Sequence, residues 1–253
     1  MELSLYWMQT PNWETIGPPP LSLFVLEQGR AALELARVGP RRKRLKTAPR
    51  GDGHPVLVLP GLLAGDLSTV PLRGFLRALS YDARGWGLGV NMGPTDALRT
   101  KLDDLLVRTR EKHGQAVSLV GWSLGGIYAR ELARAHPDLV RCVITLGTPF
   151  RDISASHAAR LVPIRPGGRL LRNAHDLRAY LRTPVPVPTT SIFSKTDGIV
   201  HWQSCLETEG PERENVEVAC SHTGMGFHAE TLAVVADRLA QPIGKWRYYA
   251  KPA

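Results

Sequence analysis

Residues 116 to 126 read Ala-Val-Ser-Leu-Val-Gly-Trp-Ser-Leu-Gly-Gly, and this stretch decides the fold. Its first part, Ala116–Val120, is a short and mostly apolar run that is typical of a buried parallel strand. Its second part has the pattern G-x-S-x-G, with Ser123 at the centre. Helical periodicity then continues over Leu124–Ala135 and stops at His136-Pro137. The stretch therefore predicts a strand, a tight turn at Ser123 and a helix.

The residue types around Ser123 fit the steric demands of such a turn. A turn this tight forces a strained backbone conformation on Ser123. Side chains two positions before and two positions after it would collide, and those positions are Gly121 and Gly125. The hydroxyl is then presented at the N-terminus of the next helix, whose dipole favours developing negative charge. We therefore predict that Ser123 is a nucleophile.

Alternating strands and helices continue on both sides of this turn. The predicted strands are Pro55–Leu59, Tyr81–Trp86, Cys142–Leu146, Thr189–Phe193 and Val216–Ala219, and the predicted helices are Leu21–Arg37, Pro71–Leu79, Asp96–Lys112 and His228–Ala240. This order predicts an α/β fold with a mostly parallel central sheet and helices on both faces. The reactive groups of such a sheet gather at the carboxyl ends of its strands.

Two segments depart from this alternation. Residues 150–187 carry several Arg, Pro and Gly residues and predict a small cap insertion, with short helical pieces at Ser154–Leu161 and Ala174–Leu181. Residues 1–53 are predicted to be an N-terminal extension with an amphipathic helix and a basic linker, and residues 54–253 the core. The basic run Arg41-Arg42-Lys43-Arg44 is interpreted as an exposed linker. The alternative is a membrane-surface patch that acts with the preceding helix.

A serine hydroxyl is a weak nucleophile without a base, which we expect after the last strand. Two histidines follow that strand. His222 lies in the loop that leaves the strand and is the predicted base. His228 begins the final helix and is interpreted as a helix-start or surface residue. The other histidines are interpreted as ordinary polar residues: His54, His113, His136, His157, His175 and His201.

The acid that orients the base is expected between the serine and the histidine in chain order. Asp197 follows the strand Thr189–Phe193 and is the predicted acid, although Asp197-Gly198 could also be a simple turn. Asp152 and Asp176 are rivals, but both lie in the irregular insertion.

An oxyanion hole needs two backbone N–H groups. One is expected from Leu124, directly after the serine. The other is expected from Leu62, in the loop that follows the strand Pro55–Leu59, where Gly61 would let the chain turn sharply.

Taken together, these residues resemble the α/β-hydrolase superfamily, specifically its compact bacterial esterases and lipases. The segments that carry the resemblance are Val56–Leu62, Gly121–Gly126, Leu146–Pro149, Thr196–Val200 and Ser221–Met225. The resemblance implies the α/β-hydrolase fold, with Asp197 as the family's acid and His222 as its base. Many relatives have His-Gly where this chain has Pro60-Gly61, a departure that affects a side chain of the oxyanion loop rather than its N–H.

The resemblance also implies an activity. We expect cleavage of carboxylic esters, from a small-molecule ester or a lipid, through an acyl-enzyme on Ser123, with no metal or organic cofactor. The same three residues would also serve an acyltransferase or a thioesterase. A non-catalytic binding protein on this fold is the hypothesis from another class, but such proteins usually lack a member of the triad. The sequence does not determine the acyl chain length, esterase or lipase preference, or oligomeric state.

Charge and composition narrow the partners. The chain has a net charge of +9, which raises the question of nucleic-acid binding. No basic-aromatic stripe, helix-turn-helix pattern or zinc-ligand spacing accompanies this charge, so we interpret it as an Arg-rich solvated surface and expect no nucleic-acid partner. A positive surface could also draw the protein to anionic membranes.

The location and redox state are expectations from simple patterns. The first residues lack the pattern of a secretory signal, and no apolar run approaches about 20 residues, so the expected location is the cytoplasm. Three cysteines do not make a secreted disulfide framework. Cys142 is predicted to lie in the core, and a bridge between Cys205 and Cys220 is left open.

Overall fold

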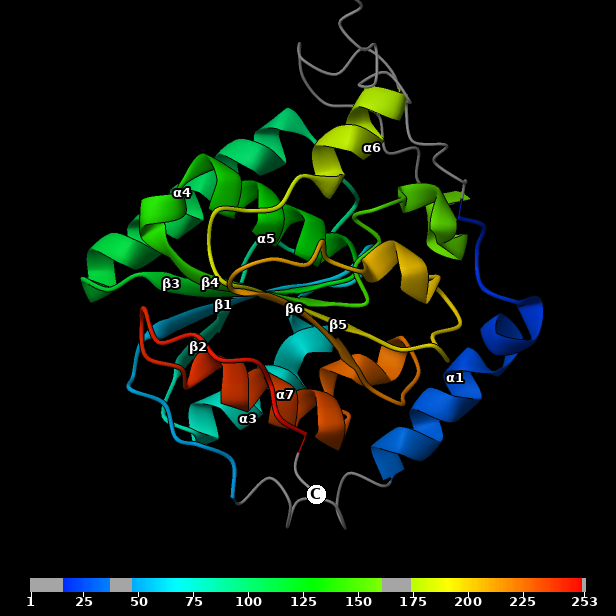
Figure 1. The fold of residues 1–253 in the computed structure, drawn as a ribbon, viewed down its shortest axis with the longest axis horizontal. Coiled ribbons are helices and arrows are strands. Elements are labelled where there is room, and N and C mark those ends of the chain that lie inside the picture. Colours follow the sequence, from blue (N-terminus) through cyan, green and yellow to red (C-terminus); the bar gives the residue numbers. More distant parts are fainter. Residues whose placement is uncertain (1–15, 37–46, 161–173, 252–253) are drawn as a thin grey trace, which may run out of the picture.

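The computed structural model describes residues 16–36, 47–160 and 174–251, and its centre is a six-stranded parallel sheet (Figure 1). The strand order is β2-β1-β3-β4-β5-β6. The strands are β1 (Pro55–Leu59), β2 (Asp82–Gly85), β3 (Val117–Trp122), β4 (Val140–Leu146), β5 (Thr189–Phe193) and β6 (Arg213–Glu217). All pairs are parallel, so the carboxyl ends of the strands meet at one edge of the sheet.

Helices cover both faces of this sheet (Figure 1). Helices α4 (Asp96–His113) and α5 (Leu124–Ala135) lie on one face, and α3 (Val70–Ala78) and α7 (Ala229–Leu239) lie on the other. Helix α6 (Ala174–Arg182) contributes Leu181 to the core on the α5 side. Helix α1 (Leu21–Ala36) stands apart from both layers and contacts the loop after β6.

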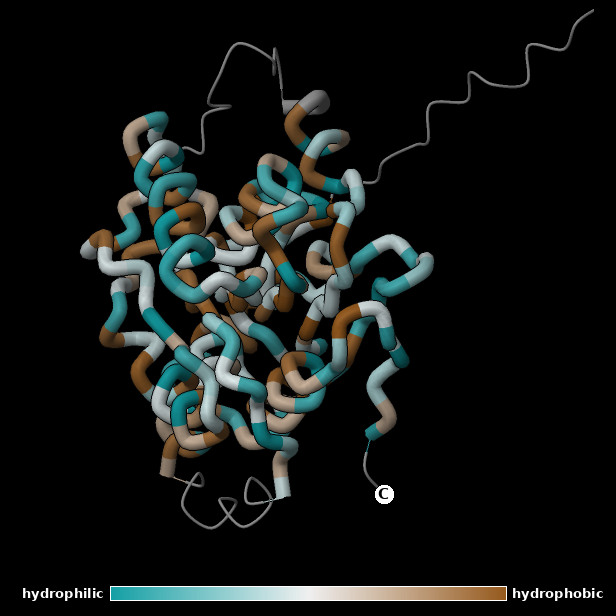
Figure 2. Tube along the Cα trace, turned by 90° about the vertical axis from the view of Figure 1, so that its left-hand side faces the viewer, coloured by the Kyte–Doolittle hydropathy of each residue, from teal (hydrophilic) through white to brown (hydrophobic). Residues whose placement is uncertain are grey.

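The period-two geometry of the strands divides the core into two clusters. In β1, Val56 and Val58 face α3 and α7, whereas Leu57 and Leu59 face α4 and α5. All four side chains are buried, as expected for a central parallel strand. On the outer helices the chain alternates between hydrophilic and hydrophobic residues, so that each helix turns one face to the sheet (Figure 2).

The α/β-hydrolase fold predicted from the sequence is confirmed, and the first five strands lie within about two residues of their predicted positions. The last strand was predicted at Val216–Ala219 but spans Arg213–Glu217. As an edge strand, β6 pairs only with β5, and its residues alternate between buried and more exposed. The apolar run therefore marks only its end.

The insertion contains shorter elements than the sequence predicts. The piece expected at Ser154–Leu161 consists of the 3-10 turns η3 (Ile153–Ala155) and η4 (His157–Arg160). The second piece is α6, as expected. Residues 161–173 of the predicted cap and the basic run at residues 41–44 lie outside the described residues. Cys142, Cys205 and Cys220 are all buried and free, so no bridge joins Cys205 to Cys220.

Helix α1 begins at the predicted residue, and its predicted last residue, Arg37, lies outside the described residues, but most of its large apolar side chains do not face the protein. Leu26, Leu33 and Leu35 are exposed, whereas Glu27 and Ala31 are its buried residues. Across the described part of the chain, each helix is too short or too polar to cross a bilayer.

A buried ion pair fastens the segments around the carboxyl edge of the sheet. Arg130 of α5 pairs with Glu207, and both side chains are almost fully buried. Arg130 also donates to the carbonyl of Thr183 (3.1 Å), just after α6, and its guanidinium lies 3.9 Å from the centre of the Phe150 ring, just after β4. The pair thus joins α5 to three neighbouring segments.

We expect Glu207→Gln to lower the free energy of unfolding by about 3–5 kcal/mol, because it leaves a buried guanidinium without its counter-charge. The matched control is Glu217→Gln, which breaks the exposed Glu217–Lys195 pair and should cost less than about 1 kcal/mol. Urea unfolding measures both values. Similar losses in the two variants would contradict the role given to Arg130.

Candidate active site

Ser123 lies in the turn that joins β3 to α5, at the carboxyl edge of the sheet. Its backbone has a φ of 54° and a ψ of −121°, a positive-φ conformation that is strained for a residue with a side chain. Its N–H donates to the carbonyl of Leu146 at the end of β4 (2.8 Å), which fixes the turn against the neighbouring strand. The side chain is half-buried, so the hydroxyl sits between the core and the surface.

The turn is possible only because glycines flank it. A Cβ atom on Gly121 would lie 2.3 Å from the Cα of Gly126, and one on Gly125 would lie 2.3 Å from the carbonyl oxygen of Leu59. Real Cβ atoms do not approach backbone this closely. The backbones of β1, β3 and α5 therefore meet around Ser123 without room for side chains.

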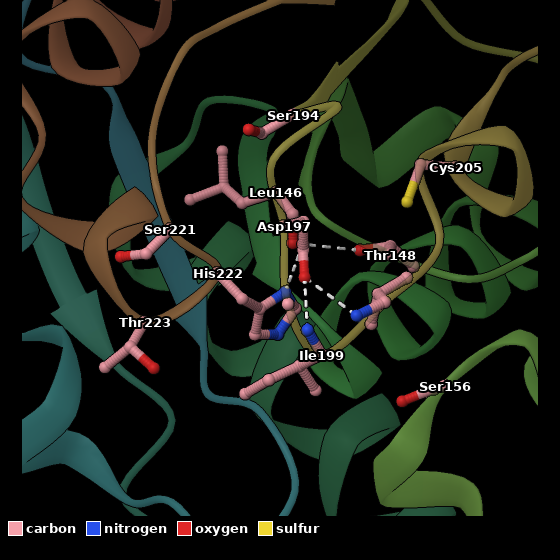
Figure 3. A network of polar contacts seen from close by, with 12 residues as sticks. Leu146, Thr148, Ser156, Ser194, Asp197, Ile199, Cys205, Ser221, His222 and Thr223 are labelled. Atoms are coloured by element: carbon pink, nitrogen blue, oxygen red, sulfur yellow. Dashed lines mark hydrogen bonds and ion pairs between the residues drawn. The ribbon is translucent and has the colours of Figure 1, made fainter. Parts of the chain in front are cut away.

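Asp197 and His222 lie together in buried positions on two neighbouring loops (Figure 3). Asp197 Oδ2 is 2.6 Å from His222 Nδ1. Asp197 Oδ1 accepts hydrogen bonds from the N–H groups of Ile199 (2.8 Å) and Val200 (2.7 Å), which hold the carboxylate in place. Because an ionised carboxylate only accepts, Nδ1 carries the proton, and Nε2 of the neutral ring keeps a lone pair.

The charge state of His222 is set by opposing effects. Burial of the ring would by itself lower the pKa of His222. The negative charge of Asp197 and its hydrogen bond act in the opposite direction, and the charge of Glu27 adds to them. As a result, the pKa of His222 is raised above its usual value of 6.5.

Two contacts place the His222 loop beside the serine turn. Trp122 Nε1, adjacent to Ser123 in the chain, donates to the carbonyl of His222 (3.2 Å). Gly147, which has a φ of 54°, packs so closely on the ring that a Cβ there would lie 2.9 Å from His222 Nδ1. Within the described residues, no hydrogen bond joins Ser123 to His222. Such bonds are often long without substrate and tighten in the complex.

Helix α1 holds the loops of Asp197 and His222 through three charged side chains. The buried carboxylate of Glu27 accepts from the N–H of Gly198 (3.0 Å) and of Thr223 (2.8 Å), the residues that follow Asp197 and His222. Arg30 donates to the carbonyl and hydroxyl of Thr196.

The third of these side chains holds the His222 loop from its other side. Glu34 accepts from the N–H (2.8 Å) and hydroxyl (2.6 Å) of Ser221. The sequence analysis missed these three residues. Their only signal is their spacing, since Arg30 and Glu34 follow Glu27 by three and seven residues, which puts all three on one face of an otherwise uncharged helix.

The loop that follows β1, residues 60–66, is held by Asn91, which the sequence analysis also missed. The backbone of Asn91 accepts from the Leu63 N–H (2.7 Å) and donates to the Ala64 carbonyl (2.8 Å), and its Nδ2 donates to the Pro60 carbonyl (3.0 Å). The Leu62 N–H has no acceptor within the described part of the chain. The Leu124 N–H begins α5 and so has no intrahelical acceptor.

The role of Gly61 differs from the expected one. Its backbone has no positive φ, and the left-handed residue of this loop is Leu63, with a φ of 57°. A Cβ on Gly61 would lie 3.2 Å from the Cβ of Ser123. Gly61 therefore allows the loop after β1 to approach the serine, whereas the positive φ falls two residues later, at Leu63.

The rival residues lie elsewhere. His228 is the N-cap residue of α7, and the carboxylate of Asp197 is occupied by His222 and two backbone N–H groups. Asp152 is paired with Arg178 (3.1 Å) and caps η3. Asp176 belongs to α6, and its side chain is outside the described residues.

A second Ser-His-Asp cluster lies at the opposite edge of the sheet. His54, just before β1, contacts Asp52 through Nδ1 and the hydroxyl of Ser118 through Nε2 (2.8 Å), and Arg141 bonds Asp52 (2.8 Å). His54 and Ser118 are both fully buried, and burial is the main cause that lowers the pKa of His54. Because Ser118 is inaccessible and lies at the amino end of β3, we interpret this cluster as a structural network. Among the described residues, no cluster of acidic, His or Cys side chains could hold a metal ion.

Comparison with known proteins relates the sequence to a family of this fold. The model of the Alpha/beta hydrolase family matches residues 56–249. A search of the curated proteins gives no match.

Solved structures give the same fold at low identity. Lipase B of Aspergillus fumigatus has a TM-score of 0.56 and 16% identity, over 77% of this chain and 55% of the lipase, so this chain spans about half its length. Mature lipase BlEst2 of Bacillus licheniformis has a TM-score of 0.55 and 16% identity, over 77% of this chain and 95% of the lipase. Mouse alpha/beta hydrolase domain-containing protein 10 has a TM-score of 0.52 and 17% identity, over 75% and 89% of the two chains. At these identities the likeness shows the fold alone.

We expect Glu27→Gln to lower the pKa of His222. The substitution removes a negative charge that favours the protonated ring, so the ring should lose its proton at a lower pH. Titration of the ring by NMR measures this pKa. Glu34→Gln is the matched control, because it also removes a helix-to-loop contact but its charge does not act on the pKa of His222. An unchanged pKa in Glu27→Gln, or an equal shift in both variants, would contradict the role given to Glu27.

Proposed function

The chain belongs to the alpha/beta hydrolase family, and on that premise we propose that it cleaves carboxylic esters through an acyl-enzyme on Ser123. The observation that carries the proposal is the buried Asp197–His222 pair, whose Oδ2 and Nδ1 atoms lie 2.6 Å apart, together with the bond from Trp122 that ties the His222 loop to the serine turn. This pairing leaves the Nε2 lone pair of His222 free, on a loop tied to the strained turn of Ser123, which supports His222 as the base. The two lipases compared above share the fold of this chain. That this chain also cleaves esters is our proposal.

In the first step the Ser123 hydroxyl attacks the ester carbonyl while His222 Nε2 takes its proton. The carbonyl oxygen gains negative charge, which the N–H groups of Leu62 and Leu124 stabilise. The tetrahedral intermediate then collapses, the bond to the alcohol breaks, and His222 gives its proton to the leaving alkoxide. The products are a free alcohol and an acyl group on Ser123.

In the second step water attacks the acyl group and gives a proton to His222. A second tetrahedral intermediate collapses, and the proton returns to Ser123 as the carboxylic acid leaves. Asp197 stabilises the charged imidazole in both steps and keeps Nδ1 as the protonated nitrogen. The two backbone donors that hold Asp197 leave its second oxygen aimed at the ring.

We expect the protein to hydrolyse p-nitrophenyl esters and Ser123→Ala to abolish the turnover while the variant stays folded. Esters from acetate to palmitate should be tested, with circular dichroism as the check on folding. Residual activity of Ser123→Ala above a few per cent would exclude Ser123 as the nucleophile. Ester turnover that requires an added acceptor alcohol would favour the transferase alternative, and hydrolysis of thioesters without hydrolysis of the oxygen esters would favour the thioesterase alternative.

The base is tested by a pair of histidine variants. His222→Ala should lose nearly all activity, whereas His228→Ala should keep most of it. In the parent protein, kcat/KM should rise with pH through a value above 6.5, because His222 accepts a proton only when neutral and its pKa is raised. An equally deep loss in His228→Ala would reverse the choice of base.

The oxyanion hole is tested through the residue that holds its loop. We expect Asn91→Ala to lower kcat by roughly tenfold with little change in KM, less than the roughly 100- to 1000-fold loss typical when an oxyanion donor is removed. Tyr128→Phe is the control, because it removes only the hydroxyl that donates to Asn91 Oδ1 (3.1 Å). A higher KM with unchanged kcat in Asn91→Ala would place Asn91 in substrate binding instead.

A further inference from the structure

Helix α1 has the reverse polarity of an ordinary surface helix, which buries its apolar side. Its outward face is formed by apolar side chains that are 54% to 77% exposed: Leu21, Val25, Leu26, Leu33 and Leu35. Its inward face carries Glu27, Arg30 and Glu34, the side chains that hold the loops of Asp197 and His222. The helix is therefore attached mainly through polar contacts, while these five large apolar side chains remain exposed.

We propose that this outward face of α1 docks on an anionic lipid surface. The first argument is the distribution of charge on the helix. All three of its charged side chains bond the catalytic loops, so neither of its two carboxylates is directed at an approaching anionic surface. What remains outward is uncharged and mostly apolar, with Ser22 and Gln28 as its exposed polar side chains, and this composition suits the boundary between headgroups and acyl chains.

The second argument is charge complementarity in the sequence. The ten residues that follow the helix contain six bases and no acid: Arg37, Arg41, Arg42, Lys43, Arg44 and Lys46. The whole chain carries a net charge of +9. Basic residues beside an apolar helix face favour an anionic lipid surface over a neutral one, because each base near an anionic surface adds to the attraction.

Docking on this face would bring the lipid close to the candidate active site. A helix with its side chains is about 10–12 Å across. The lipid surface would therefore lie about one helix diameter from the loops that carry Asp197 and His222. If the proposed function holds, this proximity points to lipid esters as the substrate class of the protein. The docking itself does not depend on catalysis.

Vesicle binding tests the proposal and should be measured on Ser123→Ala protein, so that turnover cannot change the lipid. The probes are vesicles of equimolar phosphatidylcholine and phosphatidylglycerol, and vesicles of phosphatidylcholine alone, separated by sedimentation. We expect binding to the anionic vesicles and weaker binding to the neutral ones. Adding Val25→Glu and Leu33→Glu should weaken binding at least about tenfold, because two apolar side chains are lost from the contact.

The matched control is Ile243→Glu, which introduces the same charge at a 74% exposed residue after α7. Ser123→Ala protein that also carries Ile243→Glu should bind the anionic vesicles as strongly as Ser123→Ala alone. All these positions are exposed and glutamate favours helix, so the variants should fold, and thermal unfolding checks this. Failure of Ser123→Ala to bind anionic vesicles would overturn the proposal, as would undiminished binding of the Val25→Glu, Leu33→Glu protein.

A further result would replace the lipid with another partner. If the parent protein is a dimer that Val25→Glu and Leu33→Glu convert to a monomer, and neither binds vesicles, the face mediates self-association and the proposal is wrong. These results stay separate from the proposed function. Absence of ester turnover in the parent protein would contradict that function while leaving vesicle binding unchanged.

Discussion

Between β3 and α5 the chain reverses within a few residues, and the backbone of Ser123 is held at a φ of 54°. This conformation is unfavourable for a residue with a side chain, so the surroundings must compensate for it. They do so through close contact of backbones. Gly121 packs on Gly126, Gly125 packs on Leu59, and the Ser123 N–H bonds the end of β4. The position of the serine therefore depends on the register in which β1, β3 and β4 pair.

The same edge of the sheet receives the loops of Asp197 and His222, which follow β5 and β6, but the core does not hold these loops alone. A helix outside the region matched by the family model binds them through Glu27, Arg30 and Glu34. Because Glu27 bonds the residues after both Asp197 and His222, one carboxylate fixes the spacing of the two loops. Helix α1 therefore belongs structurally to the candidate site, although it precedes the sheet in sequence by many residues.

Much of this arrangement could be predicted from the sequence because its signals are local. Apolar runs located five strands closely, and the rule that reactive groups follow strand ends placed Asp197 and His222 in neighbouring loops. The position predicted for the edge strand β6 was wrong by about three residues at its start. One face of this strand is partly exposed, so its sequence is not a continuous apolar run. Helix periodicity located α1 but could not say which face turns inward. That choice depends on backbone N–H groups of distant loops, which need acceptors and leave no signal in the sequence. The contacts of Gly147 with His222 and of Asn91 with Pro60 could not be predicted either, because they also join residues that are distant in the sequence.

The proposed reaction requires that the strained turn and the buried Asp197–His222 pair activate the hydroxyl of Ser123. Reaction with a fluorophosphonate tests it most directly, because the serine oxygen displaces fluoride only when a base accepts its proton. After digestion, mass spectrometry should find the phosphonyl group on Ser123, and the labelling should be lost in His222→Ala. A folded parent protein that remains unlabelled, or that is labelled at another residue, would contradict the account.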